Sequence, residues 1–263
     1  MRKLVLPLAL LLIGCGAAPP EPEPKAEMPL WLFVLAGQSN MAGRGVVEVI
    51  DSTPHPRVFA LKSDGGWGPA TEPLHWDKPD IIGVGPGFAF GRAMAERNPD
   101  VRIGLIPTAV GGSSIRAWVP GGLHEQTQSH PWDDAIKRIQ QVRETTGGEL
   151  KGIIWHQGES DSKDYHDEYP AAIADLIARF RSELGAPNLP FVAGQMGAFY
   201  VDKHPGSEIV NAAIADLPNQ IPHTAYVSAE DTVHKGDEVH FDSASARTMG
   251  ERYAAAMEGL IKQ

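Results

Sequence analysis

Short, almost wholly apolar runs recur along this chain, and longer segments of mixed character separate them. The first run, 30–36, has the length and composition of a strand buried on both faces rather than of a free-standing helix. Similar runs predict strands at 102–107, 150–155, 190–195 and 224–228. The segment 57–62 is a further candidate for a short strand, inside a Gly- and Pro-rich region whose aromatic residues favour an ordered, functional loop.

Apolar residues at helical spacing fill the segments between these strands. They predict helices over 87–98, 131–146, 168–184, 207–217 and 243–261. Strands that alternate with helices over the whole length predict an α/β fold, in which helices cover both faces of a parallel sheet. We find no internal repeat and no second domain, so residues 30–263 are interpreted as one domain.

The first residues follow the pattern of a secretory signal peptide. Basic Arg2 and Lys3 precede about ten mostly apolar residues, too few to span a bilayer. We therefore interpret residues 1–14 as a signal peptide, and Cys15 resembles the lipid-modified first residue of a bacterial lipoprotein; a buried or free cysteine is the alternative. Residues 15–29 then comprise the lipidated cysteine and a Pro-rich tether with a reach of roughly 40 Å. This pattern predicts an exported protein, anchored to a bacterial membrane on its periplasmic or cell-surface side.

Charge and cysteine content narrow the classes of partner. The chain carries a formal charge of −10, and loss of residues 1–14 removes two cations and no acids, which changes −10 to −12. A nucleic acid or an anionic membrane surface held by charge is therefore disfavoured as a partner. Cys15 is the sole cysteine, so neither an intrachain disulfide nor a thiolate metal site is expected. The sequence indicates no obligate protein partner.

Several predicted strands finish in short polar clusters. Ser39 and Asn40 follow the first strand, a second cluster occupies 111–114, and a third occupies 156–161. The carboxyl ends of parallel strands share one edge of a sheet, where ligands bind in open α/β folds. Ser39 is therefore our first candidate for a reactive residue. The alternative is that Ser39 or Asn40 merely caps a short helix.

A reactive serine needs a base that removes its proton and a third group that orients the base. Asp237 and His240 stand three residues apart just before the last predicted helix. A turn there would let the carboxylate of Asp237 accept a hydrogen bond from His240 Nδ1 while Nε2 faces Ser39. The alternative is a local surface turn, since an acid three residues before a histidine is common.

Acyl transfer also needs hydrogen-bond donors for the oxyanion that develops on the attacked carbonyl. The backbone amide of Ser39 is one candidate. Gly112 is a second, because a glycine lets the backbone come close to a ligand, and the side-chain amide of Gln157 is a third. The alternatives are that Gly112 only makes a turn and that Gln157 bonds to backbone.

Four sequence blocks, in this order, carry a family resemblance: GQSNM at 37–41, GGSSI at 111–115, WHQGESD at 155–161 and DEVHFD at 237–242. Together they resemble the SGNH hydrolase superfamily, and within it the sialate O-acetylesterase and carbohydrate esterase family six, acetylxylan esterase-like, group. The resemblance implies a flavodoxin-like, three-layer α/β/α fold with a parallel sheet of about five strands. It also implies no metal or organic cofactor and removal of acetyl groups from sugar hydroxyls.

Carried over by position, the resemblance implies that Ser39 is the nucleophile, His240 the base and Asp237 its orienting acid. It implies Gly112 and Gln157 as oxyanion partners, with Gln157 in place of the asparagine for which the superfamily is named. The GxSxG elbow of ordinary α/β-hydrolases is absent.

Other residues near this edge are weaker candidates. Glu159 is a secondary candidate for the orienting acid, although we favour a role in fixing its loop. Long loops also carry Trp118, Arg116, His75 and Trp76, which suit stacking on a sugar or hydrogen bonding to its hydroxyls. The alternative is that these side chains only pack their loops.

The sequence therefore predicts a lipid-tethered serine esterase that removes O-acetyl groups from oligo- or polysaccharide, such as sialate or xylan esters, through an acyl-enzyme on Ser39. Two rivals remain open. One is a non-catalytic carbohydrate-binding lipoprotein that kept the fold, and the other is an esterase or thioesterase for longer acyl chains.

Overall fold

The computed structural model describes Met1 and residues 27–262. Cys15 and most of the predicted signal peptide and tether lie outside the described residues. Among the helices that are described, none is both long and apolar enough to span a bilayer.

Seven strands form a single sheet in the order β3-β2-β4-β1-β5-β6-β7. Neighbouring strands are parallel except for the antiparallel pair β2 and β3. The strands are β1 (Leu30–Gly37), β2 (Val58–Leu61), β3 (Trp67–Pro69), β4 (Arg102–Pro107), β5 (Glu149–His156), β6 (Phe191–Gly194) and β7 (Thr224–Val227).

The five strands predicted most strongly from the apolar runs are all present, in the order β4-β1-β5-β6-β7. Counted along the chain this is second, first, third, fourth, fifth, the flavodoxin-like order. The sheet has seven strands rather than about five because β2 and β3 extend its edge. A strand as short as β3 shows no usable alternation of apolar and polar residues, so the sequence did not predict it.

The helices of three or more turns lie where the sequence predicts them. They are α3 (Pro86–Arg97), α4 (Pro131–Thr146), α5 (Tyr169–Glu183), α7 (Gly206–Gln220) and α8 (Ser243–Ile261). The sequence missed the single-turn elements α2 (Val49–Ser52), η1 (Ile115–Ala117) and α6 (Ala198–Val201). A short helix after the first strand was considered only as an alternative; α1 (Ser39–Ala42) is present, but its N-cap is Gln38 and no side chain caps it. One turn is too short to show a 3.6-residue period.

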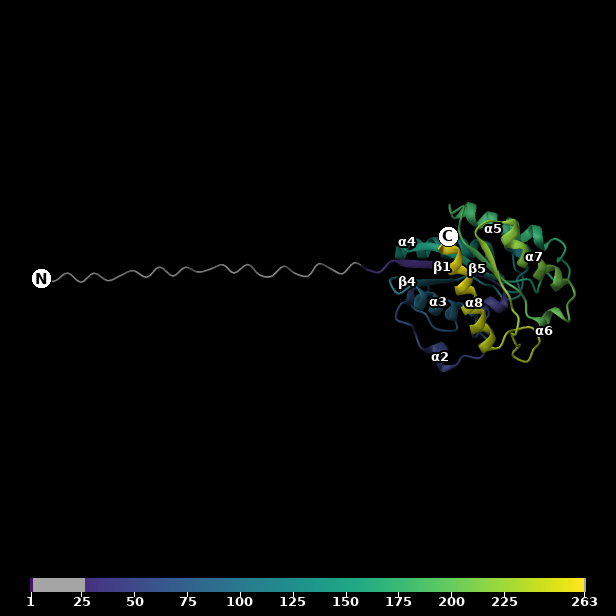
Figure 1. The fold of residues 1–263 in the computed structure, drawn as a ribbon, viewed down its shortest axis with the longest axis horizontal. Helices are drawn as coiled ribbons and strands as arrows, with labels where there is room; N and C mark the ends of the chain where they lie inside the picture. The colour runs from purple at the N-terminus through teal and green to yellow at the C-terminus, as the bar shows by residue number, and fades with distance from the viewer. Residues whose placement is uncertain (2–26, 263) are drawn as a thin grey trace.

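Strand β1 shows how the layers are built. Its side chains alternate between two apolar cores, so that Leu32 and Val34 enter one while Phe33 and Leu35 enter the other. Helices α4, α5 and α7 cover the first face of the sheet, and α3 and α8 cover the second (Figure 1). The predicted three-layer α/β/α arrangement is confirmed.

The central pair β1 and β5 brings two of the predicted polar clusters together. Gly37 at the end of β1 is paired with His156 at the end of β5. Gly37 has a φ of +129°, and a Cβ there would lie 2.1 Å from the His156 carbonyl oxygen. Glycine is therefore required at this position, and it places the segment after β1 directly against the loop after β5.

Candidate active site

Ser39 is the first residue of the one-turn helix α1, directly beyond the end of β1. Its Oγ lies 3.0 Å from His240 Nε2, although the two residues are 201 positions apart in sequence. The side chains of Ser39 and His240 both line one pocket. The predicted contact between the Ser39 hydroxyl and the His240 imidazole is therefore present in the structure.

Asp237 orients the imidazole. Its Oδ2 lies 2.7 Å from His240 Nδ1. Its Oδ1 accepts the backbone N–H groups of Val239 and His240, at 3.0 and 2.8 Å. One carboxylate thus fixes both the ring of His240 and the backbone that carries it. The aspartate of a Ser-His-Asp triad orients its histidine in the same way.

The protonation states suit a serine nucleophile. Partial burial alone would raise the pKa of Asp237, but hydrogen bonds from the His240 backbone, the His240 ring and Val239 hold that pKa far below its usual range. Burial lowers the pKa of His240 below its usual value of 6.5, although Asp237 opposes the shift. His240 is therefore neutral at pH 7 and can accept the proton of Ser39.

Asn40 connects the nucleophile turn to two other segments of the site. Its Nδ2 donates to Glu159 Oε1 at 2.6 Å and to the Val239 carbonyl at 3.0 Å. Its Oδ1 accepts the backbone N–H of Phe241 at 3.0 Å. Asn40 therefore ties the segment that carries His240 to the turn that carries Ser39.

Glu159 does not act as the orienting acid in this structure. Its carboxyl group is buried and accepts the hydrogen bond from Asn40, whereas Asp237 occupies His240 Nδ1. Burial raises the pKa of Glu159. The contact with Asn40 agrees with the role in fixing the loop that we favoured from the sequence.

Two backbone amides are available for an oxyanion. Ser39 opens α1, and the first N–H groups of a helix have no partner within it. Gly112 lines the same pocket and has a φ of +82°, which favours glycine. Among the hydrogen bonds of the described residues, none uses the N–H of Ser39 or of Gly112. Both donors were predicted.

Gln157 is placed differently from the prediction. Its side chain is fully buried, and its Nε2 lies near three acceptors: Gln38 Oε1 at 3.2 Å, the Ser113 carbonyl at 3.1 Å, and Asp161 Oδ2. An amide nitrogen carries only two hydrogens, so neither remains for an oxyanion. The prediction of Gln157 as an oxyanion donor is wrong, and its amide instead braces the loop after β4.

The loop after β4, which carries Gly112, is held by hydrogen bonds at both ends. Asp161 accepts the backbone N–H of Ile115 at 2.9 Å. At the other end Asp77 Oδ2 accepts the N–H of Gly111 at 2.7 Å and pairs with Arg44 at 3.0 Å. Buried acids therefore hold the backbone of this loop. An oxyanion site requires such fixed donors, because they must not rearrange during the reaction.

The pocket beside Ser39 has a volume of about 260 Å³ and a basic lining. Arg44, Lys78 and Lys163 contribute to it, together with Tyr200 and His204. The sequence analysis missed all five, because they come from irregular loops or from the single turn α6, whose spacing gives no signal. Of the five, only Arg44 could have been suggested from the sequence, because it lies close to Ser39 along the chain.

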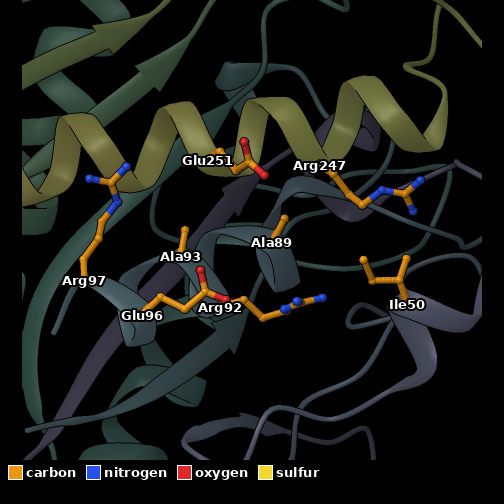
Figure 2. A pocket seen from close by; sticks show the side chains of 8 residues that line it. All are labelled: Ile50, Ala89, Arg92, Ala93, Glu96, Arg97, Arg247 and Glu251. Carbon is orange, nitrogen blue, oxygen red and sulfur yellow. The ribbon is translucent and has the colours of Figure 1, made fainter. Parts of the chain in front are cut away.

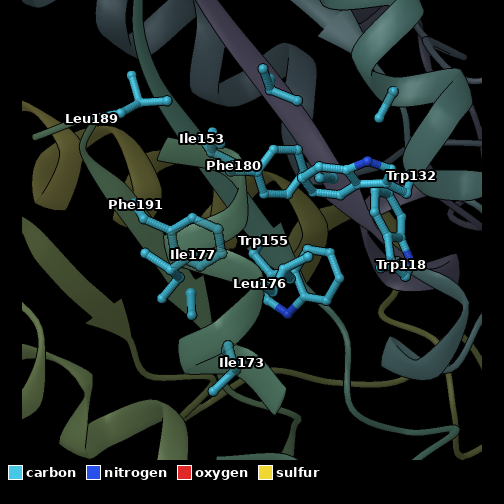
Figure 3. Close-up of a cluster of buried hydrophobic side chains, with 14 of the residues drawn as sticks. Trp118, Trp132, Ile153, Trp155, Ile173, Leu176, Ile177, Phe180, Leu189 and Phe191 are labelled. Atoms are coloured by element: carbon cyan, nitrogen blue, oxygen red, sulfur yellow. The ribbon is translucent and has the colours of Figure 1, made fainter. Parts of the chain in front are cut away.

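The predicted sugar-binding role of Trp118 is wrong. Its side chain is fully buried and packs edge-on against Trp155, with ring centroids 5.0 Å apart (Figure 3). Its indole N–H donates to Ser113 at 3.0 Å. His75 is also buried, with Nε2 3.4 Å from the Leu35 carbonyl, and burial lowers its pKa to about 4. Neither ring can stack on a ligand.

Trp76 and Arg116 also lie outside the lining of the Ser39 pocket. Trp76 is half-buried beneath the guanidinium of Arg138, 4.6 Å from its ring centroid. Arg116 is exposed, stacks on Tyr165 at 4.8 Å and pairs with Asp164 at 3.1 Å. The structure does not bring these two predicted residues to the site.

A larger hollow of about 400 Å³ lies between α3 and α8 (Figure 2). It contains none of the predicted site residues. Two of its three arginines have other partners: Arg247 pairs with Asp51 and Arg97 with Glu258. Across the part of the chain that the structure describes, no group of three or more His, Cys, Asp or Glu side chains is arranged to hold a metal ion.

Comparison with known proteins gives a consistent result. Residues 29–259 match the model of a carbohydrate esterase family described as sialic acid-specific acetylesterase. The chain is 34% identical over 250 residues to a probable carbohydrate esterase of Arabidopsis thaliana, covering 87% of this chain and 90% of that protein. The X-ray structure of an Arabidopsis thaliana protein superimposes with a TM-score of 0.75 at 32% identity, covering 88% of this chain and 98% of the other.

A more distant solved structure shares the fold, and a further relative matches part of the sequence. The crystal structure of NanS superimposes with a TM-score of 0.73 at 18% identity, covering 89% of this chain and 98% of the other. Human sialate O-acetylesterase is 28% identical over 130 residues, which are 41% of this chain and 24% of that protein.

Proposed function

The chain belongs to the carbohydrate esterase family described as sialic acid-specific acetylesterase, and from that premise we propose that it hydrolyses O-acetyl esters of carbohydrate through an acyl-enzyme on Ser39. The observation that carries this proposal is the continuous hydrogen-bonded series from Asp237 through His240 to Ser39 Oγ, with distances of 2.7 and 3.0 Å. The narrower assignment to carbohydrate esterase family six stays a prediction from the sequence motifs.

The geometry supports a two-step reaction. His240 Nε2 takes the proton of Ser39 as Oγ attacks the acetyl carbonyl carbon, and the N–H groups of Ser39 and Gly112 stabilise the oxyanion. Collapse breaks the ester bond, and the leaving sugar oxygen takes the proton from His240. A water then gives its proton to His240 and attacks the acetyl-enzyme, which releases acetate and restores the Ser39 hydroxyl.

The lining of the pocket supports an acidic sugar as the preferred substrate, that is, a sialate-type rather than a xylan-type ester. Arg44, Lys78 and Lys163 gather there in a chain whose formal charge is −10. Arg44 is paired with Asp77, so Lys78 and Lys163 are the cations best suited to a substrate carboxylate. A neutral acetylated sugar could accept hydrogen bonds from them but would lack the ion pair that a carboxylate forms.

Export and lipid anchoring through Cys15 remain our proposal from the sequence pattern alone. The direction of β1 fits such an anchor. The described chain enters β1 at Leu30, and Ser39 follows the opposite end of that eight-residue strand. The strand spans roughly 26 Å, so the active site would face away from a membrane attached at the N-terminal side.

Turnover of p-nitrophenyl acetate and of acetylated sialic acid, xylan and peptidoglycan fragments tests the proposal. We expect Ser39→Ala to lose about 10⁴-fold or more in kcat. Retained activity in this variant would reject Ser39 as the nucleophile. A carbohydrate-binding protein without catalysis would show no turnover by the wild type. In a series of p-nitrophenyl esters of increasing acyl length, an esterase for longer acyl chains would show kcat/KM that rises with acyl length.

A further inference from the structure

The residues Asp237 and His240 lie in an irregular hairpin over 233–242, which we call the catalytic hairpin. Two backbone hydrogen bonds close it, from Lys235 N–H to the His240 carbonyl and from Asp242 N–H to the Val233 carbonyl, both at 2.9 Å. Beyond these bonds, side chains rather than a regular ladder hold the tip of the hairpin. The side chains that accept the N–H groups of the tip therefore bear on the position of the orienting acid, Asp237.

His234 accepts two of them. Its Nδ1 lies 3.0 Å from the N–H nitrogen of Gly236 and 3.1 Å from that of Glu238. Gly236 and Glu238 are the immediate neighbours of Asp237. Because Asp237 Oδ1 accepts the next two N–H groups, those of Val239 and His240, two side chains organise almost the whole backbone of the tip.

The backbone at these two positions has a conformation that hydrogen bonds from its N–H groups help to stabilise. Gly236 has a φ of +116° and Glu238 a φ of +63°. The second value is in the left-handed region, which a residue with a Cβ adopts at a cost. Glu238 also pairs with Lys203, but both side chains are about half exposed, and exposed ion pairs contribute little. The Nδ1 acceptor of His234 is therefore one of the two side-chain acceptors that hold the backbone of this turn, beside Asp237 Oδ1.

The ring of His234 is itself held in place. It packs against Phe199 of α6, with centroids 5.4 Å apart, and Phe199 also packs against Phe241 at 5.7 Å. The imidazole is thus fixed between α6 and the hairpin, with Nδ1 directed at the tip. Since Nδ1 accepts, the ring proton of the neutral form is on Nε2.

We propose that His234 is a positioning residue for this esterase, whose Nδ1 lone pair sets the backbone around Asp237 and so the orientation of His240 toward Ser39. The proposal rests on the proposed function, since it assigns His234 to the same reaction. No contact with substrate is required of His234.

The test compares two substitutions of similar size. In His234→Asn the Oδ1 atom takes the place of Nδ1 and still accepts, whereas His234→Leu has the same branched shape without an acceptor. We expect His234→Leu to lower kcat for p-nitrophenyl acetate by roughly 10- to 100-fold with KM little changed, because displacing a catalytic group by about 1 Å has effects of this order. We expect His234→Asn to keep most of the wild-type kcat.

Amide hydrogen exchange gives a readout that does not depend on turnover. The N–H groups of Gly236 and Glu238 should exchange faster in His234→Leu than in the wild type and stay protected in His234→Asn. His234→Ala removes the acceptor without adding δ-carbons, and it is expected to show the same loss if the leucine variant does not fold.

The outcomes separate this inference from the proposed function. Equal activity of the wild type and the leucine or alanine variant would overturn the role of His234. An equal loss in folded asparagine and leucine variants would also overturn it, because the ring and not the acceptor would then matter. Absence of turnover in the wild type would refute the proposed function instead.

Discussion

Asn40 offers a quantitative test of how the site is assembled. Asn40→Ala removes the donor to Glu159 Oε1 and the acceptor of the Phe241 N–H, both of which are buried. It also removes the donor to the partly buried Val239 carbonyl. The substitution thus separates the nucleophile turn from the catalytic hairpin without touching Ser39, His240 or Asp237.

The expected cost follows from the two buried groups left without a partner. Each costs about 1–3 kcal/mol, so the free energy of unfolding should fall by about 2–6 kcal/mol, against a total of about 5–15 kcal/mol for a typical domain. For a domain of this size, that loss corresponds to a fall in Tm of roughly 4–24 °C. We also expect kcat to fall, since His240 loses two of the contacts that hold its segment beside Ser39.

Thermal unfolding followed by circular dichroism measures the stability, and p-nitrophenyl acetate turnover measures the activity at a temperature where the variant is folded. Glu159→Gln is the matched control, because its amide oxygen can still accept from Asn40. The control puts an amide nitrogen where Glu159 Oε2 has no hydrogen-bond partner among the described residues, so its Tm should fall less than that of Asn40→Ala and its kcat should change little. A Tm of Asn40→Ala within about 2 °C of the wild type, with unchanged kcat, would refute the reasoning, since it would imply a loss below about 1 kcal/mol.

Three further predictions follow from the site. Asp237→Asn should lower kcat by about 10⁴-fold, the order expected when the orienting acid is lost, whereas Glu159→Gln should stay near wild type; steady-state kinetics decides, and the reverse order would make Glu159 the orienting acid. Burial lowers the pKa of His240 below 6.5, so the base stays neutral to lower pH and the acid limb of kcat/KM should lie below that value; a limb above it would contradict the assignment. Lys78→Met and Lys163→Met should each raise KM for an acetylated acidic sugar by roughly 10-fold, as expected for loss of about 1.4 kcal/mol, and leave p-nitrophenyl acetate unaffected; equal effects on both substrates would reject these lysines as carboxylate ligands.

The sequence was sufficient to predict the elements that long, regular patterns specify. The apolar run that forms β1 and the helically spaced apolar residues that form α4 and α8 were predicted with nearly correct bounds. The meeting of Ser39 with His240 was also predictable, because a parallel sheet brings the carboxyl ends of distant strands to one edge. The short spacing between Asp237 and His240 then restricted how the acid meets the base.

The direction of a side chain was not predictable in the same way. Gln157 lies at the end of β5, as expected, but three acceptors around its amide turn it into the core and away from the oxyanion position. Trp118 follows the single turn η1, and whether it covers the site or fills the core depends on Trp155, which lies 37 positions later in the chain. Such outcomes depend on tertiary neighbours that local patterns do not specify.

The central claim is that His240 activates the hydroxyl of Ser39. Mass spectrometry of peptides after treatment with a fluorophosphonate tests it directly, because this reagent bonds covalently to an activated serine. We expect near-complete labelling on the peptide that contains Ser39 in the wild type and little labelling in the folded His240→Ala variant. Labelling of another serine, or equal labelling of Ser39 with and without His240, would contradict the account.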